Sequence, residues 1–66
     1  MQIILNGEPH LLEGDASLLV LLETLEVEKD HAALMLNGVV IPATNWHEQT
    51  LQENDEVEMM VFVGGG

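Results

Sequence analysis

The chain has 66 residues, 47% of them hydrophobic, which predicts one small folded domain and excludes an intrinsically disordered chain. Twelve acidic residues stand against one basic residue, Lys29, so the net charge is −11 and no basic patch for nucleic acid or an anionic membrane can form. The sequence contains no cysteine, which excludes disulfides, thiolate metal sites and thiol nucleophiles.

The apolar segments are short. No uninterrupted apolar run, including those at residues 18–22 and 59–63, is longer than five residues. A membrane-spanning helix needs about 20 apolar residues, and no basic stretch followed by an apolar one precedes the domain. We therefore expect a soluble, cytoplasmic protein that is a monomer when alone and has no membrane partner.

A β-hairpin is predicted at the start of the chain. Residues 1–5 alternate with the period of a strand and end at Asn6-Gly7, the strongest two-residue hairpin signal because both positions tolerate positive φ. Residues 8–13 form the return strand. Pro9 confines this strand to a sheet edge, because proline cannot donate to a ladder on both sides.

One helix is predicted after the hairpin, with Ser17 as its N-cap and its end near Leu25 or Val27. Four leucines at positions 18, 21, 22 and 25 have the spacing of one buried helix face. Val20 points roughly the opposite way, so we expect an exposed apolar residue there that is available for contact with a partner.

A second, shorter hairpin is predicted around Asn37-Gly38, from residues 33–36 and 39–41, and it stops at Pro42. The polar segment that follows is expected to hold one short helical turn capped by Thr44. Trp46 is expected to cover one end of the core while its indole N–H reaches water.

The last predicted strand begins at Glu56 after a turn at Asn54-Asp55. Its even positions, which include Met60 and Phe62, form the face away from the helix. We expect Met35 and Met59 in the core, and Met60 and Phe62 as a partner-docking patch. The alternative is that the loop with Trp46 or Leu51 covers them.

The predicted order is strand, strand, helix, strand, strand, short helical turn, strand. One helix cannot cover both faces of a sheet, so we expect an α+β fold with a mixed sheet and the helix packed on one face. A right-handed crossover leaves the last strand free to pair in parallel with the first, at the centre. Residues 1–63 form this domain, and residues 64–66 form a flexible glycine tail.

Side chains that could carry catalysis are not grouped in the sequence. His10, His31 and His47 lack metal-site spacing, and we expect them at the surface with no metal bound. Glu56 and Glu58 point the same way but form a solvated face rather than an acid–base pair. Ser17 has no basic partner at helical distance, so the chain is not expected to be an enzyme.

The three glycines at positions 64–66 are the most informative feature. Without side chains they contribute no packing, but they place a carboxylate on a thread slim enough to enter a narrow active site. A plain linker is the alternative. The glycines are therefore disordered, artificial or chemically used, and the chemical use would be of the terminal carboxylate.

The sequence resembles the ThiS family, the β-grasp, ubiquitin-like sulfur carriers of thiamine biosynthesis. The similarity covers the whole chain, although the family often has a basic residue where Ala43 stands and Gly-Asp where Asn54-Asp55 stands. The matching segments are Met1 to Gly7, Ser17 to Leu25 with Leu21-Leu22-Glu23, Leu36-Asn37-Gly38, Val40-Ile41-Pro42, Trp46, Leu51, Asn54 to Glu58 and Val63-Gly64-Gly65.

The resemblance implies that Gly64 and Gly65 thread into a ThiF-like adenylyltransferase, which uses ATP to modify Gly66 covalently by adenylation. If the chain is trimmed by one residue, Gly65 is the acceptor instead. Sulfur from a desulfurase system then gives a thiocarboxylate, which donates sulfur to a ThiG-like thiazole synthase. The carrier itself binds no cofactor. Two alternatives stay open: the small subunit of molybdopterin synthase, which uses the same thiocarboxylate, and a ubiquitin-like interaction domain with an inert tail.

Overall fold

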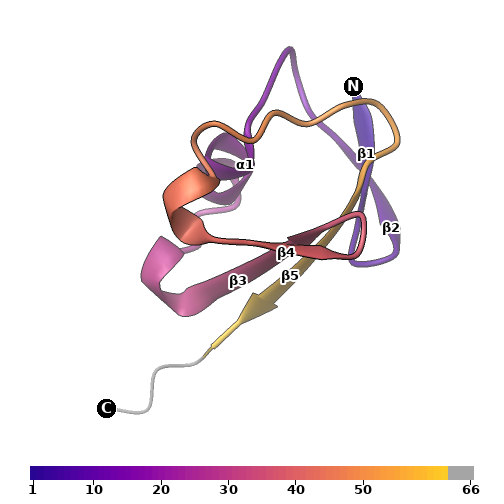
Figure 1. Cartoon of the computed structure of the whole chain (residues 1–66). Helices are drawn as coiled ribbons and strands as arrows, with labels where there is room; N and C mark the ends of the chain where they lie inside the picture. Colours follow the sequence, from indigo (N-terminus) through magenta and orange to yellow (C-terminus); the bar gives the residue numbers. More distant parts are fainter. Residues whose placement is uncertain (63–66) are drawn as a thin grey trace.

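The computed structural model describes residues 1–62 and shows a five-stranded mixed sheet with one helix on one face (Figure 1). The strand order is β2-β1-β5-β3-β4. The predicted α+β architecture is confirmed. The elements are β1 (Gln2–Leu5), β2 (Glu8–Leu11), α1 (Leu18–Thr24), the 3-10 helix η1 (Lys29–His31), β3 (Ala32–Leu36), β4 (Val39–Ile41), the 3-10 helix η2 (Ala43–Asn45) and β5 (Glu56–Val61).

Both predicted hairpin turns are present. Asn6 and Gly7 have φ of 50° and 84°, and Asn37 and Gly38 have φ of 50° and 86°. Two consecutive positive φ angles match the right-handed twist of the strands that the turn joins. Asn54, at the third predicted turn, also has a positive φ of 69°, a conformation that asparagine tolerates well.

β5 lies at the centre of the sheet, as predicted. It pairs in parallel with β1 and antiparallel with β3, so it joins the two hairpins. β2 is an edge strand, which agrees with the position of Pro9. The outer strands of both hairpins therefore lie at the two edges, and the strand that leads toward the glycines lies between them.

The helix begins where the sequence predicts and ends slightly earlier. The Ser17 hydroxyl accepts a hydrogen bond from the Val20 N–H at 3.2 Å. The last helical residue is Thr24, because Glu26 takes a φ of 58° and the Val27 N–H donates to the Leu22 carbonyl. This bond and the one from Glu26 N–H to Glu23 form a Schellman motif that closes the helix without glycine.

The core lies between α1 and the sheet. Three helix leucines are buried, and Leu25 packs against the core from a half-buried position. Val20 is 44% exposed, as the helix phase predicts. None of the charged side chains of residues 1–62 is buried. The core residues are Ile3, Leu12, Ala16, Leu18, Leu21, Leu22, Leu34, Leu36, Trp46, Leu51 and Val57.

Two predictions for the polar segment after Pro42 are wrong. Thr44 lies inside η2 and does not cap it, because Pro42 occupies the N-cap position and makes no side-chain cap bond. Trp46 is only 2% exposed, and its indole N–H donates to the Ile41 carbonyl at 2.8 Å rather than to water. The backbone of β4 supplies the acceptor that allows full burial of the ring.

Of the two methionines predicted for the core, only Met59 packs against it. Met59 is half-buried and packs against the core cluster, as predicted. Met35 lies on the opposite face, because it follows Leu34 and precedes Leu36, which both point toward the helix. Its cross-strand partners are Glu58 and Val40. The prediction of a core position for Met35 is therefore wrong.

The predicted boundary between a domain at residues 1–63 and a glycine tail at residues 64–66 lies outside the described residues, as does Val63. The described part of β5 stays paired to its end, since the Phe62 N–H donates to the His31 carbonyl at 2.7 Å.

The helix phase gives a direct prediction for stability. Leu22→Ala should lower the free energy of unfolding by about 2–5 kcal/mol, because it leaves a cavity at a fully buried position. Val20→Ala should lower it by less than about 1 kcal/mol, because the side chain is exposed. Chemical denaturation measures both values, and equal losses would contradict the packing of α1.

Candidate functional site

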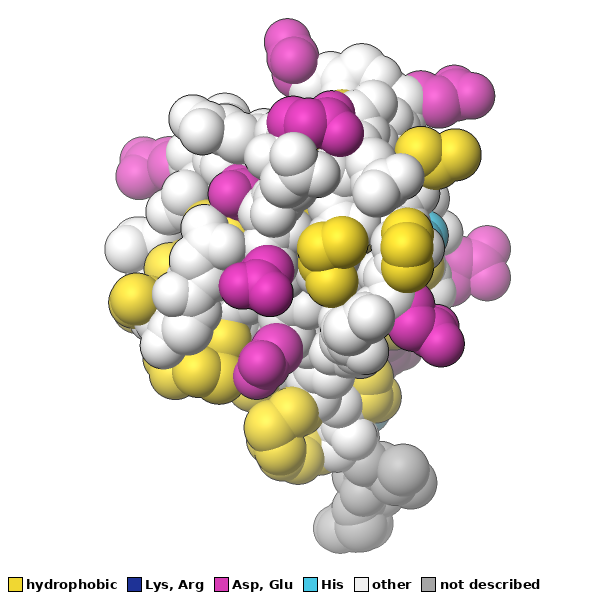
Figure 2. Space-filling model, turned by 90° about the vertical axis from the view of Figure 1, so that its right-hand side faces the viewer, with side chains coloured by type: hydrophobic (Ala, Val, Ile, Leu, Met, Phe, Trp, Pro, Cys, Tyr) yellow, Lys and Arg dark blue, Asp and Glu magenta, His cyan; other side chains and the backbone are white. Residues whose placement is uncertain are grey.

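The face of the sheet away from α1, called here the outer face, is open to solvent. Side chains of β5 alternate strictly, and Glu56, Glu58 and Met60 point to this face. Figure 2 shows groups of hydrophobic side chains separated by acidic ones on this side of the molecule. The outer face is therefore amphipathic.

Met60 and Phe62 are 59% and 53% exposed. The alternative that the loop with Trp46 or Leu51 covers them is wrong, because both of those side chains are buried in the core on the helix side of the sheet. Met60 and Phe62 thus remain candidates for partner docking.

Residues of β3 and β4 extend this apolar area. Ala33 lies opposite Met60 in the register, and Val40 lies opposite Met35. Val40 is 64% exposed. We call Ala33, Met35, Val40, Met60 and Phe62 the outer-face patch.

The sequence interpretation missed the contribution of Met35 and Val40 to this surface. The signal that could have found Met35 is its alternation with Leu34 and Leu36, which are stronger core formers in a strand of this pattern. The two-residue turn then sets Val40 opposite Met35.

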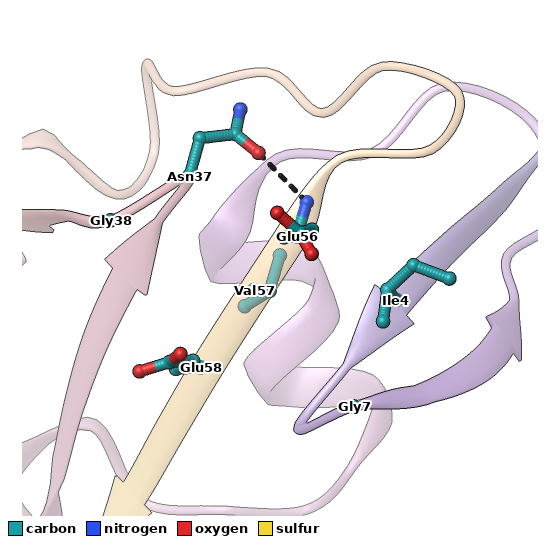
Figure 3. Close-up of a pocket in the computed structure, with 7 residues that line it drawn as sticks. All are labelled: Ile4, Gly7, Asn37, Gly38, Glu56, Val57 and Glu58. Carbon is teal, nitrogen blue, oxygen red and sulfur yellow. Dashed lines mark hydrogen bonds between the residues drawn. The ribbon is translucent and has the colours of Figure 1, made fainter.

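A shallow hollow of about 310 Å³ lies beside the patch, between the two Asn-Gly turns. Figure 3 shows Glu56 and Glu58 along β5, Ile4 across from them on β1, and the helix behind the sheet. Both carboxylates are exposed, so they give the patch an acidic border. The lining residues are Ile4, Gly7, Asn37, Gly38, Glu56, Val57 and Glu58.

Val20, the third residue predicted for docking, lies on α1 and therefore on the other side of the sheet from Met60 and Phe62 (Figure 1). The structure does not bring the three residues into one surface. A partner on the outer face would not reach Val20 through the same contact, so docking at Val20 stays a separate prediction.

The histidines form no cluster. His31 and His47 are exposed and lie near Glu28 and Glu48, at 3.7 Å and 3.5 Å, whereas His10 is half-buried at the edge of the sheet. Among residues 1–62, no group of three His, Cys, Asp or Glu side chains could hold a metal ion. No helix in this part of the chain is long and apolar enough to cross a membrane.

The candidate modification site, Gly66, and the threading residues Gly64 and Gly65 lie outside the described residues. The structure locates the strand that leads to them. β5 is the central strand, and Met60 near its end and Phe62 directly after it form the apolar end of the outer face.

Comparison with known proteins places the chain in a family. The model of the ThiS family matches residues 3–66. The chain is 27% identical to the sulfur carrier protein ThiS of Escherichia coli, over the full length of both. A crystal structure of the thiamine biosynthesis protein ThiS from Geobacter metallireducens superposes with a TM-score of 0.84 at 30% identity, covering 100% of both chains.

A different kind of relative is a thiazole synthase of Magnetococcus marinus. It is 38% identical over all 66 residues of this chain, which span 20% of that longer protein. A small domain similar to this chain is thus part of a protein named for thiazole synthesis. Taken with the family match and the shared fold, the chain belongs to the ThiS family of sulfur carriers.

Proposed function

We propose that this chain carries sulfur as a thiocarboxylate on Gly66 and delivers it for thiazole formation in thiamine biosynthesis. The observation that carries the proposal is the family match, which extends through the glycine residues to position 66. The central position of β5, which leads to these glycines, supports it. The match favours the thiamine pathway over the molybdopterin alternative.

The chemistry begins with a carboxylate, which is a poor acceptor for sulfur until one oxygen becomes part of a good leaving group. Attack of the Gly66 carboxylate on ATP would give the glycyl adenylate and pyrophosphate. Sulfur at the oxidation level of sulfide (HS⁻) would then add to the carbonyl carbon, expel AMP and lose its proton, leaving the thiocarboxylate. Both steps need a narrow site around the chain end, which residues without a Cβ can enter.

We propose that catalysis belongs to the partners and that this chain is not an enzyme. The cysteine-free sequence offers no thiol to store sulfur, and glycine offers no reactive side chain. The chain would hold no cofactor of its own, and ATP would be consumed by the partner adenylyltransferase.

We propose three partners, which membership of the family implies: a ThiF-like adenylyltransferase, a sulfur-donating desulfurase system and a ThiG-like thiazole synthase. The thiazole synthase is supported by the Magnetococcus marinus protein and by a second thiazole synthase, from Paramagnetospirillum magneticum, which is 26% identical to the whole chain. Both proteins combine a domain like this chain with a much longer remainder, and the chain spans 20% of the length of each whole protein.

We propose that these partners dock on the outer-face patch. Met60 lies on β5 and Phe62 directly follows this strand, which leads to the glycines, so a partner that takes up the tail passes close to both. Apolar anchors at the centre of an interface carry most of the binding energy. The net charge of −11 would guide the carrier toward basic clefts and mainly raise the association rate.

The tail hypothesis is tested by intact-mass measurement. ATP and the cognate adenylyltransferase should produce a chain heavier by one adenylyl group. Added sulfur donor should convert it into a chain in which one oxygen is replaced by sulfur. Deletion of Gly65 and Gly66 should abolish both species and leave the melting temperature unchanged, because glycine has no side chain to pack.

Two further variants locate the acceptor. Gly65→Val should also block the reaction, through bulk and lost φ freedom, although the carboxylate is kept. A residue added after Gly66 should block it until that residue is removed. If the tail-deleted protein still supports thiazole formation, the carrier hypothesis is wrong and the interaction-domain alternative replaces it.

The docking hypothesis predicts that Phe62→Ala raises the Kd for the adenylyltransferase or the thiazole synthase by about tenfold or more. The free energy of unfolding should change little, because the side chain is 53% exposed. Leu11→Ala is the matched control, since Leu11 is 76% exposed but lies on the edge strand β2. Calorimetric titration measures both affinities, and equal effects of the two substitutions would count against the patch.

Electrostatic guidance predicts a dependence on salt. Raising the ionic strength from about 0.01 M to about 1 M shortens the Debye length from about 30 Å to about 3 Å. The association rate should therefore fall strongly, while the dissociation rate changes much less. Stopped-flow mixing with either partner measures both rates, and a salt-independent association rate would exclude the effect.

A further inference from the structure

Asn6 makes an unusual pair of contacts with the central strand. Its side-chain oxygen Oδ1 accepts a hydrogen bond from the Met59 N–H at 2.8 Å, and its Nδ2 donates to the Met59 carbonyl at 3.3 Å. One carboxamide thus satisfies both backbone groups of a residue that is 53 positions away in the sequence.

The reason lies in where β1 ends. In the parallel ladder between β1 and β5, Ile4 pairs with Glu56 and Leu5 pairs with Val57. The Asn6 N–H still donates to the Val57 carbonyl at 2.9 Å. At Asn6 the main chain turns away with a φ of 50°. The next hydrogen bonds of the ladder are then made by the Asn6 side chain, whose carboxamide has the same donor and acceptor groups as a peptide.

These bonds act on the end of β5 that matters for the proposed function. Met59 comes directly before Met60 and three residues before Phe62. On its other side this end is paired with β3, up to the bond between the Phe62 N–H and His31. On the side facing β1, the strand pairing ends before Met59, and the Asn6 side chain makes the hydrogen bonds to Met59 instead.

We propose that Asn6 is a positioning residue for sulfur loading. It fixes the direction of the strand end that bears Met60 and Phe62 of the outer-face patch and leads to the glycines, so that docking surface and acceptor are presented together. The inference rests on the proposed function. Without the two hydrogen bonds from Asn6, the end of β5 is less ordered in the free chain and becomes fully ordered only when a partner binds.

Asn37 provides a matched control in the same chain. It also precedes a glycine and also has a φ of 50°. Its carboxamide contacts the other end of β5, accepting from the Glu56 N–H at 2.9 Å and donating to Asp55 Oδ1 at 3.1 Å. The two asparagines thus hold opposite ends of β5, Asn6 through both backbone groups of Met59 and Asn37 through one backbone N–H and one side chain.

The expected effect on KM follows from the fraction of carrier molecules that are able to dock. If only a fraction of carrier molecules has the strand end in the docking-competent direction, the apparent affinity falls by that fraction. Asn6→Gly should therefore raise the KM of the adenylyltransferase for the carrier by about three- to tenfold. The kcat should stay within about twofold, because the partner holds the segment once it is bound.

The experiment compares Asn6→Gly, Asn37→Gly and Asn6→Asp with the wild-type chain, at a temperature where circular dichroism shows all four folded. Glycine keeps the positive φ of the turn and removes only the side chain. Aspartate keeps an acceptor for the Met59 N–H but loses the donor, so its KM should lie between those of wild type and Asn6→Gly. Asn37→Gly should leave KM unchanged.

Amide hydrogen exchange gives a readout that needs no partner. The Met59 N–H should exchange at least about tenfold faster in Asn6→Gly than in Asn37→Gly. The reason is that Asn6→Gly removes the acceptor of this N–H, whereas Asn37→Gly leaves it in place. Equal exchange rates, or equal KM values in the two glycine variants, would overturn the positioning role. A wild-type chain that is never adenylated would instead overturn the proposed function.

Discussion

The fold depends on the pairing of β5 with both hairpins. β1 and β2 form one hairpin and β3 and β4 the other, and within the sheet order they meet only through β5. The strand that closes the sheet is thus the last element in the described chain. Because β5 pairs in parallel on one side and antiparallel on the other, its register also decides which of its side chains face the helix. Core formation and the direction of the chain toward the glycines are therefore fixed by the same set of hydrogen bonds.

A domain of this size has enough apolar residues for one core layer. The seven-residue helix covers one face of the sheet, and every fully buried side chain of residues 1–62 belongs to the cluster on that side. The outer face is then left to solvent, with apolar residues on β3, β4 and the end of β5. An exposed apolar area of this kind favours association with a partner, whereas the acidic side chains between the apolar ones and the net charge of −11 oppose association between identical copies.

Local signals predicted most of the fold. The two Asn-Gly turns, the Ser17 cap and the spacing of the helix leucines each act over a few residues, so they can be recognised in the sequence. The errors concern the orientation of single side chains, even where the residues that decide it are near in the sequence. Trp46 is fully buried because Ile41 offers a carbonyl to its indole, and Met35 points outward because of its place between Leu34 and Leu36. The contact of Asn6 with Met59 depends on the β1–β5 register, which no local pattern encodes. The exposure of Met60 and Phe62 was predicted from alternation alone, but the separation of Val20 from them required the sheet and the helix to be placed in space.

The separation of the two faces has a consequence for how such a carrier can work. Residues that determine stability lie between α1 and the sheet, whereas the outer-face patch and its acidic border lie on the other side. A partner can therefore bind the patch without access to the core, and the contacts with the partner can change with little effect on folding. The link between the two faces is the backbone of β5, which both packs Val57 into the core and presents Met60 to solvent. A substitution that loosens this strand would affect docking before it affects the core, because the strand end beyond Met59 contributes no fully buried side chain among the described residues.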